Sequence, residues 1–293
     1  MNVNDIETQL SANLGERVEI NPVHDADFKN EVLDATRKFR VQTPSGTDFF
    51  LIVSGSGNPQ LVNRAVENIR YVRENVSADV ASYVLQPVMT GTDGPLSYAV
   101  WPAKKPFPPK GRLERFFARK RYTEPVLNWG KSLTSETLKD GDASVFRGNL
   151  QTICDEEAFP QAMREDALRA EQRAQAGTWQ PRYCIQHGDF WSDNILLPTG
   201  RQEPSFYIID WAGMQSDGYP FLDLARMLMS MGCGSRLCSQ HIKDLRDHVS
   251  CDQLDVISYT LSGLGHIRQN LEYFPLKRYQ SMAIEVYNFM KLH

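Results

Sequence analysis

Apolar positions in the first hundred residues change between helical and strand-like spacing. The spacing predicts an amphipathic helix over residues 6–14 and two strands, 36–43 and 47–54, which flank a Pro-Ser-Gly turn as a hairpin. Asn58 and Pro59 are typical of a helix start, and an apolar stripe continues that helix to about residue 74. Residues 82–88 and 96–101 are strand-like and flank the turn sequence TGTDG, so we expect a second hairpin.

The rest of the chain is mainly helical in pattern. The sequence WPAKKPFPPKG at residues 101–111 carries four prolines and indicates a linker. Helical spacing follows over residues 113–121, 162–176, 221–231, 253–265 and 277–292, with strand-like pieces only at 182–186 and 205–209. We therefore predict an α+β protein with an N-terminal lobe of antiparallel sheet plus helix (residues 1–101), a linker (102–111) and a larger, mainly helical C-terminal lobe (112–293).

Composition and charge fit a soluble globular protein. Of the 293 residues, 41% are hydrophobic and 23% are charged, which allows a large core. The formal net charge of -4 gives no overall basic field, so nucleic acid is not an expected partner. The N-terminal residues lack the pattern of a signal peptide, and no apolar run is long enough for a membrane span, so we expect a cytoplasmic location. The five cysteines show no dense spacing and fit reduced thiols.

Three side chains with oxygen ligands lie near the two strand-like segments of the C-terminal lobe. Asp189 lies in the segment HGDFWSDN, Asn194 follows five residues later, and Asp210 ends the second strand-like segment in the sequence IIDW. Phosphoryl transfer needs a carboxylate that faces the acceptor hydroxyl, and oxygen ligands for magnesium, which neutralises phosphate charge. Each residue alone would be explained as a turn former, but the ordered set indicates this chemistry.

With these motifs the sequence resembles the aminoglycoside phosphotransferase and choline kinase family, which has a two-lobed protein-kinase-like fold. The resemblance rests on HGDFWSDN, IDW and DLAR, and spans about forty residues. It implies that Asp189 orients the acceptor hydroxyl and accepts its proton, and that Asn194 and Asp210 hold Mg²⁺. It also implies ATP or GTP as the phosphoryl donor and a small hydroxylated molecule as the acceptor.

The resemblance further assigns supporting residues around the catalytic loop. His187 and Gly188 would shape the loop, and Asp223 would brace it from the following helix. A structural role for His187 is favoured over proton transfer, because Asp189 already fills the position of the base.

The donor side departs from the family pattern. Kinase-like folds place a lysine on the third strand, paired with a helix glutamate, to hold the α- and β-phosphates. The matching strand, FFLIVSG, places Ile52 at the lysine position, and the apolar alignment of the next helix places Ala65 at the glutamate position, or Glu67 after a shift. The ion pair is therefore expected to be missing. Loss of both partners leaves no buried charge unpaired.

Other residues could take part in nucleotide binding. Residues 21–41, which should cover the phosphates, contain no glycine, so a close backbone approach to phosphate is harder. Lys38 and Arg40 on one strand face, or Arg64 on the helix, could supply a substitute cation, although a solvent-facing charge is the more ordinary explanation. Val100 and Trp101 are the expected neighbours of the nucleotide.

Two further patterns have competing explanations. Residues 104–121 carry eight Lys or Arg with one Glu, which could meet an anionic substrate or a membrane surface. We favour a solvated linker and helix whose apolar side is Leu113, Phe116 and Phe117.

A spacing of cysteines and histidines similar to that of zinc sites is also present. Because it lacks a tight Cys-x-x-Cys, we favour buried thiols and surface histidines. Its residues are Cys233, Cys238, His241 and His248.

The acceptor pocket is expected between the catalytic loop and the C-terminal helices. Candidate substrate-binding residues are Trp191, Ser192, Asp193, Arg268 and Glu272, and they do not name the acceptor.

An alternative function is a pseudokinase-like binding module with impaired phosphate positioning, which Ile52 and Ala65 favour. A protein kinase is disfavoured because no Ala-Pro-Glu segment or activation-loop length follows Asp210. The oligomeric state is not predicted.

Overall fold

The computed structural model describes residues 3–23, 36–177, 179–200, 202–271 and 274–293. The chain divides into two compact units. Unit 1 comprises Met1–Glu74, Ala81–Pro106 and Leu196–Ala212, and unit 2 comprises Asn75–Val80, Phe107–Ile195 and Gly213–His293. The predicted α+β class is confirmed. The functional division into a nucleotide-binding and a catalytic lobe stays a prediction.

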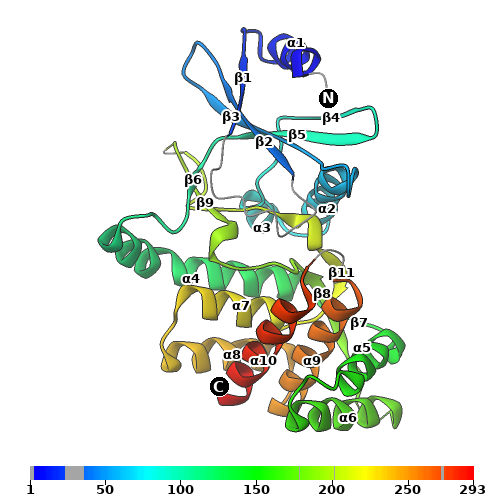
Figure 1. The fold of residues 1–293 in the computed structure, drawn as a ribbon. Helices are drawn as coiled ribbons and strands as arrows, with labels where there is room; N and C mark the ends of the chain where they lie inside the picture. The colour runs from blue at the N-terminus through cyan, green and yellow to red at the C-terminus, as the bar shows by residue number, and fades with distance from the viewer. Residues whose placement is uncertain (1–2, 24–35, 178, 201, 272–273) are drawn as a thin grey trace. The chain divides into compact units, whose positions relative to one another are not determined.

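Unit 1 is built on a five-stranded antiparallel sheet in the order β1-β2-β3-β5-β4 (Figure 1). The predicted first hairpin is confirmed as β2 and β3, which pair from Arg37–Val53 to Gln42–Asp48 around Gly46 at φ 81°. The strands are β1 (Glu19–Pro22), β2 (Arg37–Gln42), β3 (Asp48–Val53), β4 (Met89–Asp93) and β5 (Leu96–Pro102).

Side-chain alternation gives this sheet two apolar faces. Phe49, Leu51 and Val53 of β3 pack in a core with Ile6 and Leu10 of α1 (Val3–Leu14). The intervening Ile52 packs on the opposite face, in a cluster that includes Val62 and Val66 of α2 (Leu61–Glu74). The helices predicted at residues 6–14 and 58–74 are thus confirmed, with α2 starting at Leu61.

The strand predicted over residues 82–88 is wrong. The chain there leaves α3 (Ala78–Ser82) and makes one isolated bridge, in which Val84 lies beside Ile208. The first strand of the second hairpin is instead β4, which contains Met89 and the first four residues of TGTDG. The turn lies at the last of them, Gly94, whose φ of 58° suits glycine. Strand β1 was not predicted.

A small sheet in the order β10-β9-β6 joins sequence segments far apart. Its strands are β6 (Lys105–Pro106), β9 (Ile195–Leu197) and β10 (Tyr207–Ile208). Lys104 Nζ lies 2.6 Å from Glu203 Oε2, which also accepts a hydrogen bond from the Tyr207 hydroxyl at 3.2 Å. These contacts tie residues 196–212 to the predicted linker within unit 1.

Unit 2 is mainly helical (Figure 1). Helices were predicted at the positions of α4, α6, α7, α9 and α10, whereas α5 and α8 were not. The bounds are α4 (Arg112–Thr137), α5 (Ala143–Asp155), α6 (Gln161–Gln175), α7 (Leu222–Met231), α8 (Ser235–Val249), α9 (Gln253–Gln269) and α10 (Leu276–Leu292). No helix in the described ranges is long and apolar enough to cross a bilayer.

Helix α4 continues well past the predicted end at residue 121, although Pro125 lies inside it. Proline has no N–H, so the Arg121 carbonyl lacks the hydrogen bond that residue 125 would otherwise donate. The helix continues because its second half buries Val126, Trp129 and Leu133 in unit 2.

A three-stranded sheet, β11-β8-β7, lies at the start of the catalytic segment. It consists of β7 (Lys139–Asp140), β8 (Arg182–Gln186) and β11 (Gln215–Gly218). The expectation of only two strands in this part of the chain was therefore wrong, because strands of two to four residues are too short to show alternation. The exact match of β8 with prediction reflects its almost fully buried apolar run.

Candidate active site

The catalytic loop begins where β8 ends. Gln186 is buried, and its Oε1 accepts a hydrogen bond from the backbone N–H of Tyr219 at 2.8 Å. Two residues later Gly188 has φ 82°, and a Cβ at this position would overlap the backbone carbonyl of Gly213. Only glycine satisfies both conditions without strain. The backbone therefore fixes where the loop turns.

Asp223, at the start of α7, binds the backbone of this loop through its carboxylate. Its Oδ2 accepts the backbone N–H of His187 at 2.6 Å, and its Oδ1 accepts that of Gly188 at 3.1 Å. Burial raises the pKa of the Asp223 carboxyl to about 6, although these N–H groups and the Arg226 charge oppose the rise. The two bonds give a physical basis for the bracing role that the resemblance implies.

His187 is fully buried. Its Nδ1 accepts the backbone N–H of Asp189 at 3.2 Å, and its ring packs against Phe190 with centroids 5.8 Å apart. With Nδ1 accepting, the proton of a neutral ring lies on Nε2. This geometry favours a role in ordering the loop backbone.

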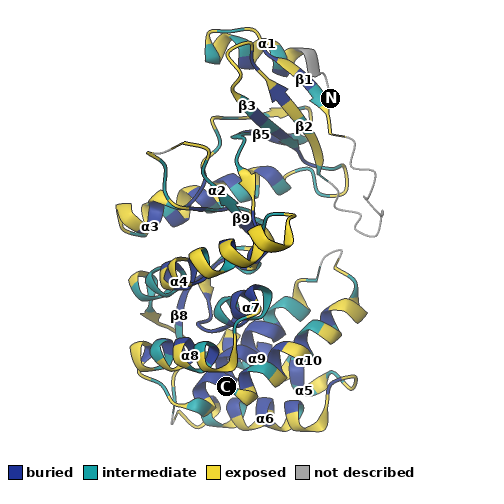
Figure 2. Cartoon of the chain, turned by 90° about the vertical axis from the view of Figure 1, so that its left-hand side faces the viewer, coloured by how far each residue is buried: buried dark blue, intermediate teal, exposed yellow. Residues whose placement is uncertain are grey.

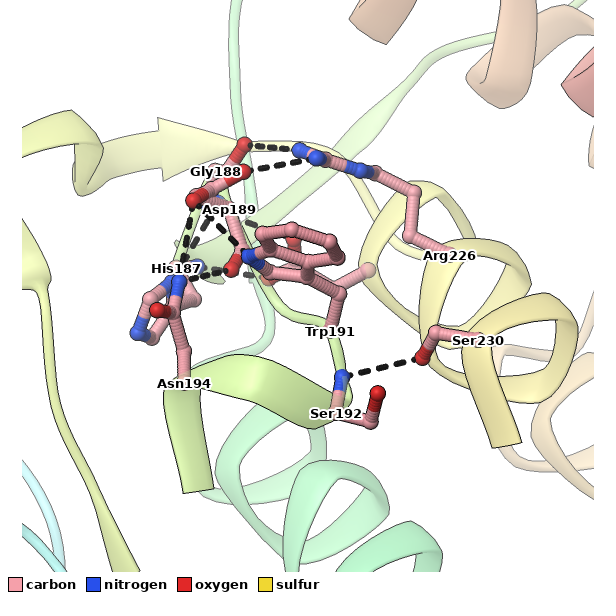
Figure 3. Close-up of polar contacts among 9 residues, drawn as sticks. His187, Gly188, Asp189, Trp191, Ser192, Asn194, Arg226 and Ser230 are labelled. Atoms are coloured by element: carbon pink, nitrogen blue, oxygen red, sulfur yellow. Dashed lines mark hydrogen bonds and ion pairs between the residues drawn. The ribbon is translucent and has the colours of Figure 1, made fainter. Parts of the chain in front are cut away.

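The Asp189 carboxylate is held on both oxygens (Figure 3). Oδ1 lies 2.6 Å from Arg226 Nη2, and Oδ2 accepts from Asn194 Nδ2 at 2.9 Å and from Trp191 Nε1 at 3.2 Å. The side chain is still 39% exposed. A fixed carboxylate that remains open to solvent can receive a ligand hydroxyl with little reorganisation.

Asn194 ends the short 3₁₀ turn Ser192–Asn194 and is buried. Its Nδ2 also donates to the Asp189 backbone carbonyl at 2.8 Å, so the amide nitrogen is committed to Asp189. The amide oxygen is the atom left to meet a cation, and Mg²⁺ prefers such oxygen ligands.

Asp210 belongs to unit 1, so its pairing with Asn194 on one metal ion stays a prediction. Its φ is 66°, a left-handed conformation that is uncommon outside glycine and concentrated at functional sites. Asp210 is exposed, and the next residue, Trp211, is fully buried.

Within the described part of the chain no three His, Cys, Asp or Glu side chains cluster as a metal site. The expected Mg²⁺ site needs only one carboxylate and one amide, completed by phosphate and water.

Two residues that contact the loop were not among the predicted site residues. Arg226 donates from Nη1 to the Gly188 carbonyl at 2.8 Å besides its ion pair with Asp189, and Ser230 Oγ accepts the Ser192 N–H at 3.0 Å. Figure 3 shows both reaching the loop from α7. Asp223, Arg226 and Ser230 are spaced i, i+3, i+7, so helical periodicity was the available signal.

The donor-side residues lie in unit 1. Ile52, at the expected lysine position, packs in the apolar cluster of α2, and Lys38 is its cross-strand neighbour. Arg40 is ion-paired with Asp48 at 2.5 Å. Glu67 is exposed and accepts a hydrogen bond from Asn63 at 3.0 Å.

The remaining nucleotide candidates differ in exposure. The Val100 side chain is fully buried in the sheet core, whereas Trp101 is half-buried and packs against the same apolar cluster as Ile52. Most of the glycine-free segment, residues 24–35, lies outside the described residues. Nucleotide contacts for Lys38, Arg40, Val100 and Trp101 stay predictions.

The substrate candidates are placed in unit 2, with one exception. Trp191 is 38% exposed, and Asp193 is exposed and accepts from the Ser192 hydroxyl at 3.2 Å. Arg268, on α9, is ion-paired with Glu156 at 2.7 Å. Glu272 lies outside the described residues.

The zinc-like spacing gives no metal cluster among the residues described. Cys238 and His241 are buried, and the His241 ring nitrogen lies 3.1 Å from Glu124 Oε2. Burial raises the pKa of the Cys233 thiol to about 11, which disfavours the thiolate that zinc needs. The expectation of a surface histidine was wrong for His241.

A comparison with known proteins gives a family match over the segment that contains these residues. Residues 142–243 match the phosphotransferase enzyme family, and this range contains the catalytic loop, Asp210 and α7. No curated protein matches the chain in sequence.

Solved structures resemble the chain along its whole length at low identity. Macrolide 2'-phosphotransferase MphH from Brachybacterium faecium is 14% identical, with 97% of each chain covered and a TM-score of 0.54. Choline kinase LicA from Streptococcus pneumoniae is 14% identical, with 100% of each chain covered and a TM-score of 0.50. Aminoglycoside 2'-phosphotransferase-IIIa, solved as its GDP complex, is 14% identical, with 99% of each chain covered and a TM-score of 0.52. The resemblance inferred from the motifs is confirmed: residues 142–243 match the phosphotransferase enzyme family, and the chain has the protein-kinase-like fold of aminoglycoside phosphotransferases and choline kinases.

Proposed function

We propose that the protein transfers the γ-phosphoryl group of ATP or GTP to a hydroxyl group of a small molecule, with Mg²⁺ as cofactor. The observation that carries the proposal is the Asp189 carboxylate, which is held by Arg226, Asn194 and Trp191 yet remains partly exposed. The family match over the same segment supports it. The similar structures include enzymes named for macrolide, choline and aminoglycoside acceptors, so the shared fold does not name the acceptor.

In the proposed mechanism Asp189 Oδ1 receives the acceptor hydroxyl. This oxygen carries one donor, Arg226, and has a second acceptor position available. As the hydroxyl oxygen bonds to the γ-phosphorus, its proton moves to Asp189 and the bond to the β-phosphate oxygen breaks, which releases the nucleoside diphosphate. Mg²⁺ would neutralise charge on the phosphates, with Asn194 and Asp210 as its protein ligands.

The proposal is tested with Asp189→Asn. Asparagine has nearly the same shape but cannot accept the proton, so we expect turnover to fall by roughly 10²–10⁴-fold. The measurement is nucleoside diphosphate release with amino alcohols, sugars, aminoglycosides and macrolides as acceptors and with ATP and GTP as donors. A thermal melt serves as the folding control. Wild-type turnover in Asp189→Asn would refute the mechanism.

A pseudokinase-like binding module is the second candidate. The apolar packing of Ile52, where a phosphate-binding lysine is expected, favours it. The two candidates differ in nucleotide binding: a nucleotide present at 100 times its dissociation constant raises the stability of the folded state by about 2.7 kcal/mol. A rise in melting temperature with Mg²⁺ and ATP or GTP supports the enzyme. No shift at millimolar nucleotide, together with no turnover, supports the binding module.

A further inference from the structure

The first turns of α4 expose a large apolar surface. Leu113, Phe116 and Phe117 are 75%, 63% and 63% exposed, and their i, i+3, i+4 spacing places them on one helix face. The two phenyl rings contact each other edge to face, with centroids 5.5 Å apart. The expected apolar side of this helix is thus present, and in the structure it is exposed. Single exposed apolar side chains are ordinary, but a contiguous cluster of large ones indicates a surface that meets a partner.

The same segment is strongly basic. We call residues 110–121 the basic apolar segment. It contains six basic residues and one acidic residue, Glu114, although the whole protein has a net charge of -4. All of them except Arg119 are exposed. The six are Lys110, Arg112, Arg115, Arg119, Lys120 and Arg121.

Helix stability does not explain these charges. Residues 110–115 surround the N-terminus of α4, where the helix dipole is positive and basic residues are unfavourable. Gly111, the N-cap, has no side chain to cap the exposed N–H groups. Glu114, the acidic residue of this first turn, lies with its carboxylate beside Gly111 and balances part of the positive charge. The excess of basic residues is left for an external anion to balance.

The segment is held firmly at its far end. Ala118 is buried, and Arg119 donates to the backbone carbonyl of Ser230 at the end of α7, at 3.3 Å. Phe107, just before the segment, is buried and packs edge to face on Tyr122. In Figure 1 the first turns of α4 extend past the ends of α7 and α8, and Figure 2 colours residues 110–117 as exposed.

We propose that the basic apolar segment docks on an anionic membrane surface, with the phenyl and leucyl side chains at the acyl boundary and the basic side chains on the lipid headgroups. A membrane interface supplies both partners, because it presents anionic headgroups next to hydrocarbon. A symmetric contact with a second copy would bring two basic segments together, which like charge opposes. Nucleic acid would balance the charge but would leave Leu113 without an apolar partner.

The test is vesicle co-sedimentation of the full chain at low ionic strength. Vesicles of phosphatidylcholine with phosphatidylserine are compared with vesicles of phosphatidylcholine alone. We expect binding to the anionic vesicles only, and weaker binding as salt is added. The variant Leu113→Gln, Phe116→Gln, Phe117→Gln should bind at least about tenfold more weakly, and so should Arg112→Gln, Arg115→Gln, Lys120→Gln.

Matched controls come from exposed residues elsewhere in unit 2. The apolar control replaces Val145, Leu254 and Leu292, which are 63%, 59% and 78% exposed, with glutamine. The charge control replaces the exposed residues Arg236, Lys243 and Arg278 with glutamine. Both controls should bind like wild type.

Four outcomes would overturn the proposal. Three of them are absence of wild-type binding to anionic vesicles, equal binding by the segment variants and their controls, and concentration-dependent self-association that only the segment variants lose. Binding to an RNA oligonucleotide without binding to vesicles would also overturn it. The readout is independent of catalysis, so the inference stands or falls separately from the proposed activity.

Discussion

At the scale of single residues, the candidate site depends on one carboxylate, Asp189, whose hydrogen-bond partners come from two places in the chain. Asn194 and Trp191 come from the loop itself, and Arg226 comes from α7. Arg226 also binds the Gly188 carbonyl, so a single guanidinium fixes both the loop backbone and the Asp189 side chain. Its planar fork suits such double contacts better than a lysine does.

Arg226→Ala should lower turnover with little change in nucleotide affinity. The substitution removes two charge-assisted hydrogen bonds and leaves Asp189 less fixed, and a loss of about 1.5–3 kcal/mol in the transition state corresponds to roughly 10–100-fold in kcat. Arg226→Lys can keep one of the two contacts and should lie between wild type and alanine. Steady-state kinetics separate kcat from KM, and a thermal melt controls for folding. Unchanged kcat in Arg226→Ala would contradict a positioning role.

At the scale of elements, the contact between α5 and α9 in unit 2 depends on a glycine. A Cβ on Gly265 of α9 would overlap the backbone of Asn149 on α5, so these helices approach at this point only because Gly265 has no side chain. Asn149 in turn donates to the Tyr219 hydroxyl at 2.8 Å, next to the strand that enters the catalytic loop. Packing of α5 on α9 is thus connected to the site by one buried side chain.

Gly265→Ala should destabilise the protein by roughly 1–3 kcal/mol, because the added methyl forces the two backbones apart. Gly148→Ala, on α5, is the matched control, since a Cβ there meets nothing within 4 Å. That change should stabilise the helix by roughly 0.5–1 kcal/mol. Urea unfolding measures both free energies. The same sign of change in the two variants would contradict the packing argument.

Two long helices, α9 and α10, and the almost fully buried strand β8 could be predicted from the sequence. The short strands β7, β9 and β11 could not, because their pairing depends on partners distant in sequence. Helix α8 was missed because its buried positions include Cys238 and His241, which do not form a plain apolar stripe. In the site, the motifs identified the loop residues and Asp223. The contacts of Arg226 and Ser230 with the loop depend on how α7 packs, which the motif order does not specify.

At the scale of the whole molecule, the free energy of unfolding should depend on pH. Folding shifts the pKa of the Asp223 carboxyl and the pKa of the Asp166 carboxyl in opposite directions. Burial raises the pKa of Asp223 above its unfolded value of 3.8 to about 6. Burial alone would also raise the pKa of Asp166, but hydrogen bonds from Lys291 and Tyr287 hold it below the usual value. The stability that Asp166 contributes is lost as pH falls. The Asp223 contribution is lost as pH rises.

The Asp223 contribution can be isolated with Asp223→Asn. Below about pH 4 the carboxyl is protonated in both states. As pH rises through about 6 the folded state must release a proton that the unfolded state has already lost, so unfolding becomes easier by up to roughly 2–3 kcal/mol. Asparagine does not titrate, so the variant should lack this decline, although it loses one acceptor and is less stable overall. Unfolding free energies from pH 4 to 7 test this, and equal slopes in both proteins would contradict it.

Pro125 has a consequence for how α4 can open. Because no N–H reaches the Arg121 carbonyl, the ladder of hydrogen bonds is interrupted directly behind residues 112–121. Helix unwinding spreads from one hydrogen bond to the next. Unwinding that starts at the exposed N-terminal end of α4 should therefore stop where this hydrogen bond is missing. The first turns are therefore expected to lose and regain helical order while the buried half, which carries Trp129 and Leu133, stays packed in unit 2.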